Sequence, residues 1–144
     1  GVFTLADALT LVELRGRLFE TLPEGAMLSV PLAEAELAPL LTPDLAIAVI
    51  NGPQLCVASG PVASIEALQR RLAEMEIDAA RVRINVAAHS PMLEPILARF
   101  GAFLRGITMH APTIPFVSNL SGAIITAAAV SKVGTLPACW MPKP

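Results

Sequence analysis

One histidine stands out in the sequence because of its neighbours. In the stretch NVAAHSPML (85–93), His89 follows small apolar residues and precedes Ser90 and Pro91. The flanking patterns predict a strand before His89 and a helix after it. A neutral imidazole can take a proton from a hydroxyl nucleophile and later return one, because its unperturbed pKa is close to neutral. His89 is therefore either a catalytic base whose nucleophile lies elsewhere or a polar residue at the start of a loop.

The composition limits the kinds of protein to consider. The chain has 144 residues, enough for one domain or two small ones, and 54% of them are hydrophobic while only 15% are charged. We therefore expect a sizeable core and some apolar surface that faces a partner. No apolar run reaches the ~18 residues of a membrane span, and the net charge of −2 gives no reason to expect nucleic acid.

Cysteine usage and the start of the chain give further expectations. Cys56 and Cys139 have neither C-x-x-C nor metal-ligand spacing, so we expect no metal site and reduced thiols in a cytoplasmic protein. The chain begins at Gly1 without a basic segment, and we expect no signal peptide. The first residues enter a helical pattern at once, which favours a start inside a longer protein.

The elements that would position His89 follow from hydrophobic spacing. Between residues 26 and 86 the pattern predicts strand, helix, strand, strand, helix and strand, the ferredoxin-like arrangement βαββαβ. A helix is predicted before this unit, and a helix and two short extended segments after it. An NGP turn at 51–53 joins the two central strands. The expected strands are 26–31, 44–50, 54–59 and 80–86, the helices are 4–21, 33–41, 62–77 and 91–105, and the extended segments are 107–112 and 114–119.

With these elements in place, the chain resembles the later part of a malonyl-type acyltransferase domain of fatty acid synthases and modular polyketide synthases. Four stretches carry the resemblance in the family's order, and together they cover residues 1 to about 126. The polyketide synthase branch is the most similar. The stretches are GVFTLADALTLVELRGRLF (1–19), GAMLSV with AIAVINGPQLCVASGP (25–61), NVAAHSPMLEPIL (85–97) and PTIPFVSNLSG (112–122).

The resemblance implies a fold of class α/β with an α+β small part. Residues 1–24 would be a helix of the large, α/β-hydrolase-like subdomain, and 25–87 the ferredoxin-like small subdomain. Residues 88–126 would return to the large subdomain with the catalytic histidine, and 127–144 would form an irregular tail. The family's serine nucleophile lies in a G-x-S-x-G turn, and this sequence contains none. We therefore expect the chain alone to be inactive.

The resemblance also implies roles for particular residues. His89 matches the catalytic histidine, and Arg15 the arginine that binds the free carboxylate of a malonyl-type group, as a guanidinium can with two parallel hydrogen bonds. Asn119 matches a positioning residue near the histidine, although it is also a plausible turn residue. Val86, Ala87 and Ala88 match the residues that sense the extender unit. The small Ala88 favours methylmalonyl or a relaxed choice over malonyl, while Val86 fits neither pattern.

The implied function is transfer of a malonyl or methylmalonyl group from CoA to the phosphopantetheine of an acyl carrier protein, with no bound cofactor. The expected partners are that carrier protein, a ketosynthase and other synthase domains, in the cytoplasm. Two other classes stay open, a non-catalytic ferredoxin-like binding module and a carrier-protein docking element. A stand-alone malonyl transacylase of fatty acid synthesis is the alternative within the enzyme class. Four arginines could form a basic face for an acidic carrier, or simply be solvated charges: Arg70, Arg71, Arg81 and Arg83.

Overall fold

The computed structural model describes residues 2–117 and 123–124, and these form two compact units. The first unit holds the described residues of Gly1–Thr21 and Ile96–Trp140, and the second holds Leu22–Pro95. The sequence predicts subdomain boundaries at 24/25 and 87/88, whereas the two compact units meet at 21/22 and 95/96. The subdomain assignment remains a prediction. Among the described residues, no helix combines the length and the apolar character that crossing a membrane requires.

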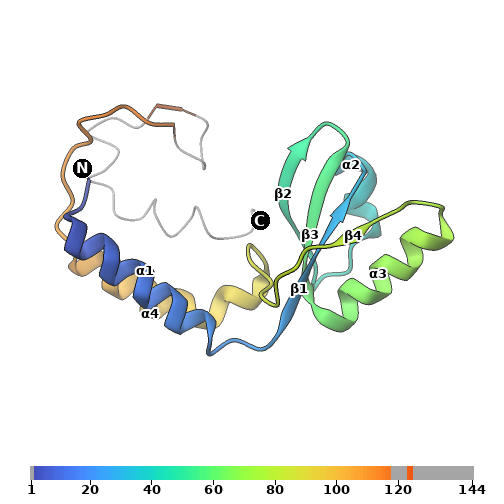
Figure 1. The fold of residues 1–144 in the computed structure, drawn as a ribbon, viewed down its shortest axis with the longest axis horizontal. Coiled ribbons are helices and arrows are strands. Elements are labelled where there is room, and N and C mark those ends of the chain that lie inside the picture. The colour runs from blue at the N-terminus through green and yellow to red at the C-terminus, as the bar shows by residue number, and fades with distance from the viewer. Residues whose placement is uncertain (1, 118–122, 125–144) are drawn as a thin grey trace. The chain divides into compact units, whose positions relative to one another are not determined.

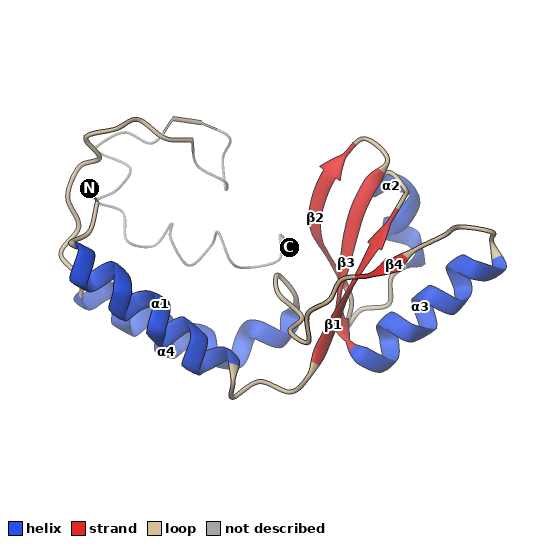
Figure 2. Ribbon diagram, in the orientation of Figure 1, coloured by secondary structure: helices blue, strands red, loops and turns tan. Residues whose placement is uncertain are grey.

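The second unit is built on a four-stranded antiparallel sheet (Figure 2). The strand order is β2-β3-β1-β4, so β1 lies inside the sheet, between β3 and β4. In β1, Ala26, Leu28 and Val30 alternate with Gly25 and Met27, and the two sets point to opposite faces. The strands are β1 (Gly25–Val30), β2 (Ala46–Gly52), β3 (Leu55–Pro61) and β4 (Ala80–Arg81).

Two helices cover one face of this sheet (Figure 1). They are α2 (Glu34–Leu37), which continues as the 3-10 turn η1 (Ala38–Leu40), and α3 (Val62–Glu74). Ile65, Leu68 and Leu72 of α3 pack in the core against the sheet. The largest members of this core are Leu28, Val30, Leu37, Ile65, Leu68 and Leu72, each no more than 3% exposed.

The opposite face of the sheet carries Met27, Val57 and Ser59, and we call it the site face. All three side chains are buried. The 3-10 turn η2 (Pro91–Leu93), which follows His89, packs against β3. The same sheet therefore has its core on one side and the segment of His89 on the other.

The order of elements in the second unit is the predicted one, but the strand expected over 80–86 is shorter and covers only Ala80–Arg81. Regular pairing with β1 ends at Arg81, and only two bonds continue beside it. The Val82 N–H donates to the Met27 carbonyl at 2.9 Å, and the Gly25 N–H donates to the Asn85 carbonyl at 3.0 Å. Between them the Ile84 N–H bonds to the Val82 carbonyl at 2.8 Å, a three-residue turn that interrupts the ladder.

Other boundaries shift by a few residues. The β2–β3 hairpin turns at Pro53 and Gln54 rather than at 51–53, because β2 keeps its pairing through two register shifts up to Gly52. Helix α3 ends at Glu74 instead of residue 77, and Glu76 adopts a left-handed φ of 60° that no helix can continue.

The first unit contains α1 (Leu5–Phe19) and most of α4 (Glu94–Gly106), close to the helices expected at 4–21 and 91–105. Thr4 caps α1, since its Oγ1 accepts from the Asp7 N–H at 3.1 Å, a cap typical of a T-x-x-D spacing at a helix start. Residues 107–116 form neither helix nor regular strand, and Val117 pairs with Ile124 in a single antiparallel bridge. Asn119 and the predicted tail 127–144 lie outside the described residues.

The apolar side chains of α1 are only partly buried. Leu18 is 3% exposed, whereas Leu5, Leu9 and Val12 are 75%, 62% and 65% exposed. The three exposed residues follow one another at helical spacing and form a continuous apolar strip. Such a strip is typical of a surface that another part of a protein covers.

We expect Leu28→Ala to lower the free energy of unfolding by ~2–5 kcal/mol, because it empties a fully buried position between β1 and the two helices. Urea unfolding of the chain measures this loss. Met75→Ala is the control in the same unit, since Met75 is 48% exposed, and its effect should stay within ~0.5 kcal/mol. Equal losses from the two variants would contradict the assignment of the core.

Candidate active site

His89 lies in a tight turn on the site face. Its φ is 58°, in the left-handed region that non-glycine residues seldom adopt, and its side chain is half-buried. Such a conformation costs on the order of 1 kcal/mol or more and persists only where surrounding contacts enforce it. The contacts that hold this turn are therefore part of the site.

Ser90 closes the turn from its own side chain. Its Oγ donates to the Ala87 carbonyl at 2.7 Å and accepts from the Met92 N–H at 3.3 Å. The Leu93 N–H also bonds to the Ser90 carbonyl at 3.1 Å, and Ser90 is fully buried. Ser90 thus connects the chain before His89 to the start of η2 after it.

Gly25 holds the other side of the turn at close range. A Cβ built on Gly25 would lie 2.4 Å from the Ala87 Cβ and 2.6 Å from the Ala87 nitrogen. Neither distance is possible for real atoms, so no other residue fits at position 25 without movement. The first residue of β1 and the segment before His89 are therefore in direct backbone contact.

The four residues 86–89 differ in exposure. Ala87 is 2% exposed because its side chain faces Gly25, whereas Val86, Ala88 and His89 are half-buried. The last three are accessible to a ligand on this face. The role of Val86, Ala87 and Ala88 in sensing the extender unit remains a prediction. Because Ala87 is buried, it could influence a bound acyl group only through Val86 and Ala88.

Arg15 lies on α1 in the first unit. Its guanidinium carbon is 4.9 Å from the centroid of the Phe19 ring, one helical turn on, and the side chain is half-buried. Arg17 is different, with 74% of its side chain exposed and a 2.6 Å ion pair to Glu13. The structure thus separates a half-buried guanidinium that lies over an aromatic ring from a solvated one.

Ser90 and Gly25 are the site residues that sequence reasoning missed. A signal for Ser90 was present, since serine before proline at a helix start is a common N-cap pattern. No local signal marks Gly25, because its close neighbour Ala87 lies far along the chain.

Other polar groups of the second unit offer no further catalytic cluster. In the part of the chain that the structure describes, no group of His, Cys, Asp or Glu side chains could hold a metal ion. Cys56 is a free, buried thiol, as expected, and burial raises its pKa, which lowers its reactivity. Cys139 lies outside the described residues. The Ser59 Oγ is buried on the site face and makes no hydrogen bond to the described residues.

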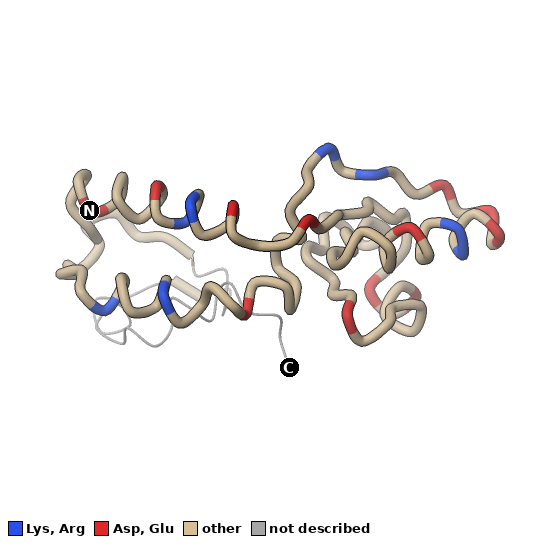
Figure 3. The backbone as a smooth tube through the Cα atoms, turned by 90° about the horizontal axis from the view of Figure 1, so that it is seen from below, with Lys and Arg blue, Asp and Glu red and all other residues tan. Residues whose placement is uncertain are grey.

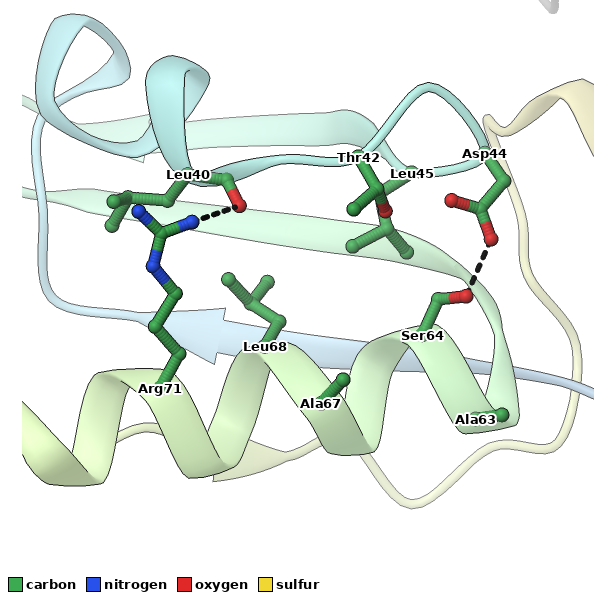
Figure 4. A pocket seen from close by; sticks show the side chains of 9 residues that line it. All are labelled: Leu40, Thr42, Asp44, Leu45, Ala63, Ser64, Ala67, Leu68 and Arg71. Atoms are coloured by element: carbon green, nitrogen blue, oxygen red, sulfur yellow. Dashed lines mark hydrogen bonds between the residues drawn. The ribbon is translucent and has the colours of Figure 1, made fainter.

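A hollow of about 310 Å³ lies on the helix side of the sheet, away from His89 (Figure 4). Its base is apolar, with Leu45, Ala67 and Leu68, and it has a charged group at each end. Both charges are bonded within the chain. Asp44 accepts from the Ser64 hydroxyl, and Arg71 Nη1 donates to the Leu40 carbonyl at 3.3 Å. These bonds join α3 to η1 and to the loop before β2, so the charged groups of the hollow have a structural role.

The four arginines considered for carrier-protein binding do not form a surface of one sign. Figure 3 shows basic positions alternating with acidic ones along α3 and the segment after it. Arg81 also lies 4.0 Å from Glu66. The acidic residues between the arginines are Glu74, Glu76 and Asp78.

Comparison with known proteins defines the class of the chain. Residues 1–133 match the family model described as "Acyl transferase domain". The chain is 38% identical over 138 residues to the polyketide synthase GfsA of Streptomyces halstedii, and 41% over 128 residues to the phenolphthiocerol synthesis polyketide synthase type I Pks15/1 of Mycobacterium marinum. These matches cover 93% and 88% of this chain but only 2% and 6% of the two relatives.

Solved structures agree with the sequence matches. The acyltransferase domain of SpnD in complex with 2-(pent-4-yn-1-yl)malonyl superposes with a TM-score of 0.89 at 32% identity, over 99% of this chain and 35% of that one. The acyltransferase domain from the second module of the salinomycin polyketide synthase gives 0.82 at 43% identity, over 91% and 32%. The chain therefore belongs to the acyl transferase domain family, and its relatives are acyltransferase domains of polyketide synthases.

A pH-dependent test follows from the bond between Asp44 and Ser64. Hydrogen bonds from Ser64 and Thr42 lower the pKa of the Asp44 carboxyl below its usual value. The resulting stability is present above the unfolded-state pKa and is lost as the pH falls through the lower, folded-state pKa. We expect Ser64→Ala to reduce the difference in stability between pH 7 and pH 3, measured by urea unfolding. An unchanged difference would show that the bond contributes nothing.

Proposed function

We propose that this chain supplies the catalytic base and the carboxylate-binding arginine of a polyketide synthase acyltransferase. The reaction would transfer a malonyl or methylmalonyl group from CoA to the phosphopantetheine thiol of an acyl carrier protein. The observation that carries the proposal is the left-handed, bonded turn of His89, at the position that matches the family's histidine. Side chains held in rare conformations are frequent at active sites.

Two half-reactions would use the same imidazole. His89 takes the proton of a serine hydroxyl in another segment of the domain, and the serine oxygen attacks the thioester carbon. The C–S bond then breaks and the CoA thiolate receives the proton from His89, which leaves an acyl-serine ester. The carrier-protein thiol reverses these steps, attacking the ester and returning the proton to serine. Backbone N–H groups would stabilise the oxyanion in each half.

Arg15 would hold the free carboxylate of the acyl group throughout. Its planar guanidinium can donate two parallel hydrogen bonds, and its contact with Phe19 restrains it. This arginine favours a dicarboxylic acyl group over a plain acetyl group. Ala88 is small and half-buried, which favours methylmalonyl or a relaxed choice, with discrimination of about 1–3 kcal/mol per methyl group. Val86 fits neither pattern.

We also propose that the two units belong to two different subdomains of the acyltransferase. We assign the second unit as a ferredoxin-like subdomain, supported by the strand order β2-β3-β1-β4 and by two helices on one face. The first unit would belong to an α/β-hydrolase-like large subdomain, to which Asn119 would contribute a positioning group. The proposed partners are the carrier protein, a ketosynthase and further synthase domains in the cytoplasm, with no bound cofactor.

The second candidate function is that the chain is part of a stand-alone malonyl transacylase of fatty acid synthesis. It is supported by the structure of FabD from Acinetobacter baumannii, which superposes with a TM-score of 0.87 at 27% identity. The higher identity to polyketide synthases, 38% to GfsA, favours the first candidate. A purely carrier-docking function has less support, because the arginines proposed for it alternate with acidic residues.

The decisive experiment is intact mass spectrometry of the polypeptide in which this sequence continues upstream through a G-x-S-x-G segment. It is incubated separately with malonyl-CoA and methylmalonyl-CoA. We expect an acyl adduct on the protein, with the preferred thioester naming the extender unit. His89→Ala should slow formation of the adduct by ~10²-fold or more, and Arg15→Ala should remove selectivity for the dicarboxylic thioester.

Two matched variants control for general damage. His110→Ala changes the other histidine, and Arg17→Ala changes the solvated arginine beside Arg15. Both should leave adduct formation unchanged. A folded protein that forms no adduct with either thioester would refute the acyltransferase proposal and favour a binding module.

A further inference from the structure

We infer that Gly25 and Ser90 are positioning residues for His89, and that both act through Ala87. The inference rests on the proposed role of His89 as base. Two independent restraints meet at Ala87, which precedes His89 by two residues. One comes from β1 and the other from the residue that follows His89.

The restraint from β1 is steric. The Gly25 N–H donates to the Asn85 carbonyl at 3.0 Å, which brings the segment against the start of the strand. The missing side chain of Gly25 lets Ala87 approach so closely that an added Cβ would overlap both the Ala87 Cβ and its nitrogen. Any side chain at position 25 must therefore push the Ala87 backbone outwards, away from the site face.

The restraint from Ser90 is a buried hydrogen bond. Its Oγ donates to the Ala87 carbonyl, with Ser90 fully buried and Ala87 2% exposed, so water does not readily replace this bond. Loss of the hydroxyl would leave the Ala87 carbonyl without this donor. The left-handed φ of His89 would then lose the contact that closes its turn.

Small displacements at such a position have large effects on rate. A general base must reach its proton within a hydrogen-bond distance, and a misplacement of about 1 Å can cost ~10²-fold in rate. The carboxylate-binding arginine lies on a different element, α1, so neither restraint acts on it directly. Disturbing Gly25 or Ser90 should thus lower kcat by a larger factor than it raises the KM for the acyl-CoA, although Val86 and Ala88 move with Ala87.

The test measures acyl transfer by the full polypeptide described above, with Ser90→Ala and Gly25→Ala. We expect kcat to fall by ~10-fold or more, with KM within ~3-fold. Ser90→Cys keeps the size and a weak donor, and should fall between wild type and Ser90→Ala. If Gly25→Ala does not fold, the two serine variants still decide the matter.

A double-mutant cycle separates positioning from a general structural effect. If Ser90 acts through His89, Ser90→Ala should cause no further loss in a His89→Ala protein. An equal fold-loss in both backgrounds would overturn the inference. Ser59→Ala and Gly52→Ala are the controls, because Ser59 is equally buried without a described hydrogen bond, and a Cβ on Gly52 would meet nothing within 4 Å. Both should retain wild-type kcat.

A second readout does not depend on catalysis. The chain has two histidines, so the ring C–H signals of His89 and His110 can be followed by NMR in the 144-residue chain. Ser90→Ala should shift the signals of His89 and leave those of His110 in place. Unchanged His89 signals would overturn the inference, even if the longer polypeptide with the G-x-S-x-G segment transfers acyl groups. Shifted signals in a protein without acyl transfer would support positioning and refute only the proposed function.

Discussion

The structure of the second unit depends on the contact between the backbones of Gly25 and Ala87. A hydrogen atom in place of a side chain is all that fits between them. This contact joins the interior strand of the sheet to the segment of His89. Because β1 also supplies Leu28 and Val30 to the core, the position of the histidine is tied to the most buried part of the unit. The core of the unit and the placement of His89 therefore depend on the same strand.

The sequence predicts those features that repeat along the chain. Helix α3, the β2–β3 pair and the Thr4 cap follow from spacing and local chemistry, and they are found close to their expected positions. The strand expected over 80–86 is found only at Ala80–Arg81, because alternation alone does not show where regular strand pairing gives way to a turn and two single hydrogen bonds. Gly25 could not be recognised as a site residue, because its role arises from a neighbour about sixty positions away. Ser90 could have been recognised from the serine–proline pair.

The second unit uses its polar groups in two different ways. On the helix side, Asp44 and Arg71 are bonded within the chain and join α3 to η1 and to the loop before β2. On the site face, the Ser90 hydroxyl holds the turn of His89 through its bond to the Ala87 carbonyl. The Ser59 hydroxyl is buried there without a described hydrogen bond, which is an energetically costly arrangement. The charged groups that look most like a ligand site are therefore structural, and the buried serine beside His89 holds the turn of that residue.

The path of the chain through the two units has a consequence for recombination between relatives. The second unit is a continuous segment, Leu22–Pro95, inserted between two separate segments of the first. A chimera with junctions at 21/22 and 95/96 would move Gly25, residues 86–89 and Ser90 together as one inheritance block. Arg15 would stay with the recipient. Such an exchange keeps the histidine with its own supports, whereas a junction between residues 25 and 87 would separate them.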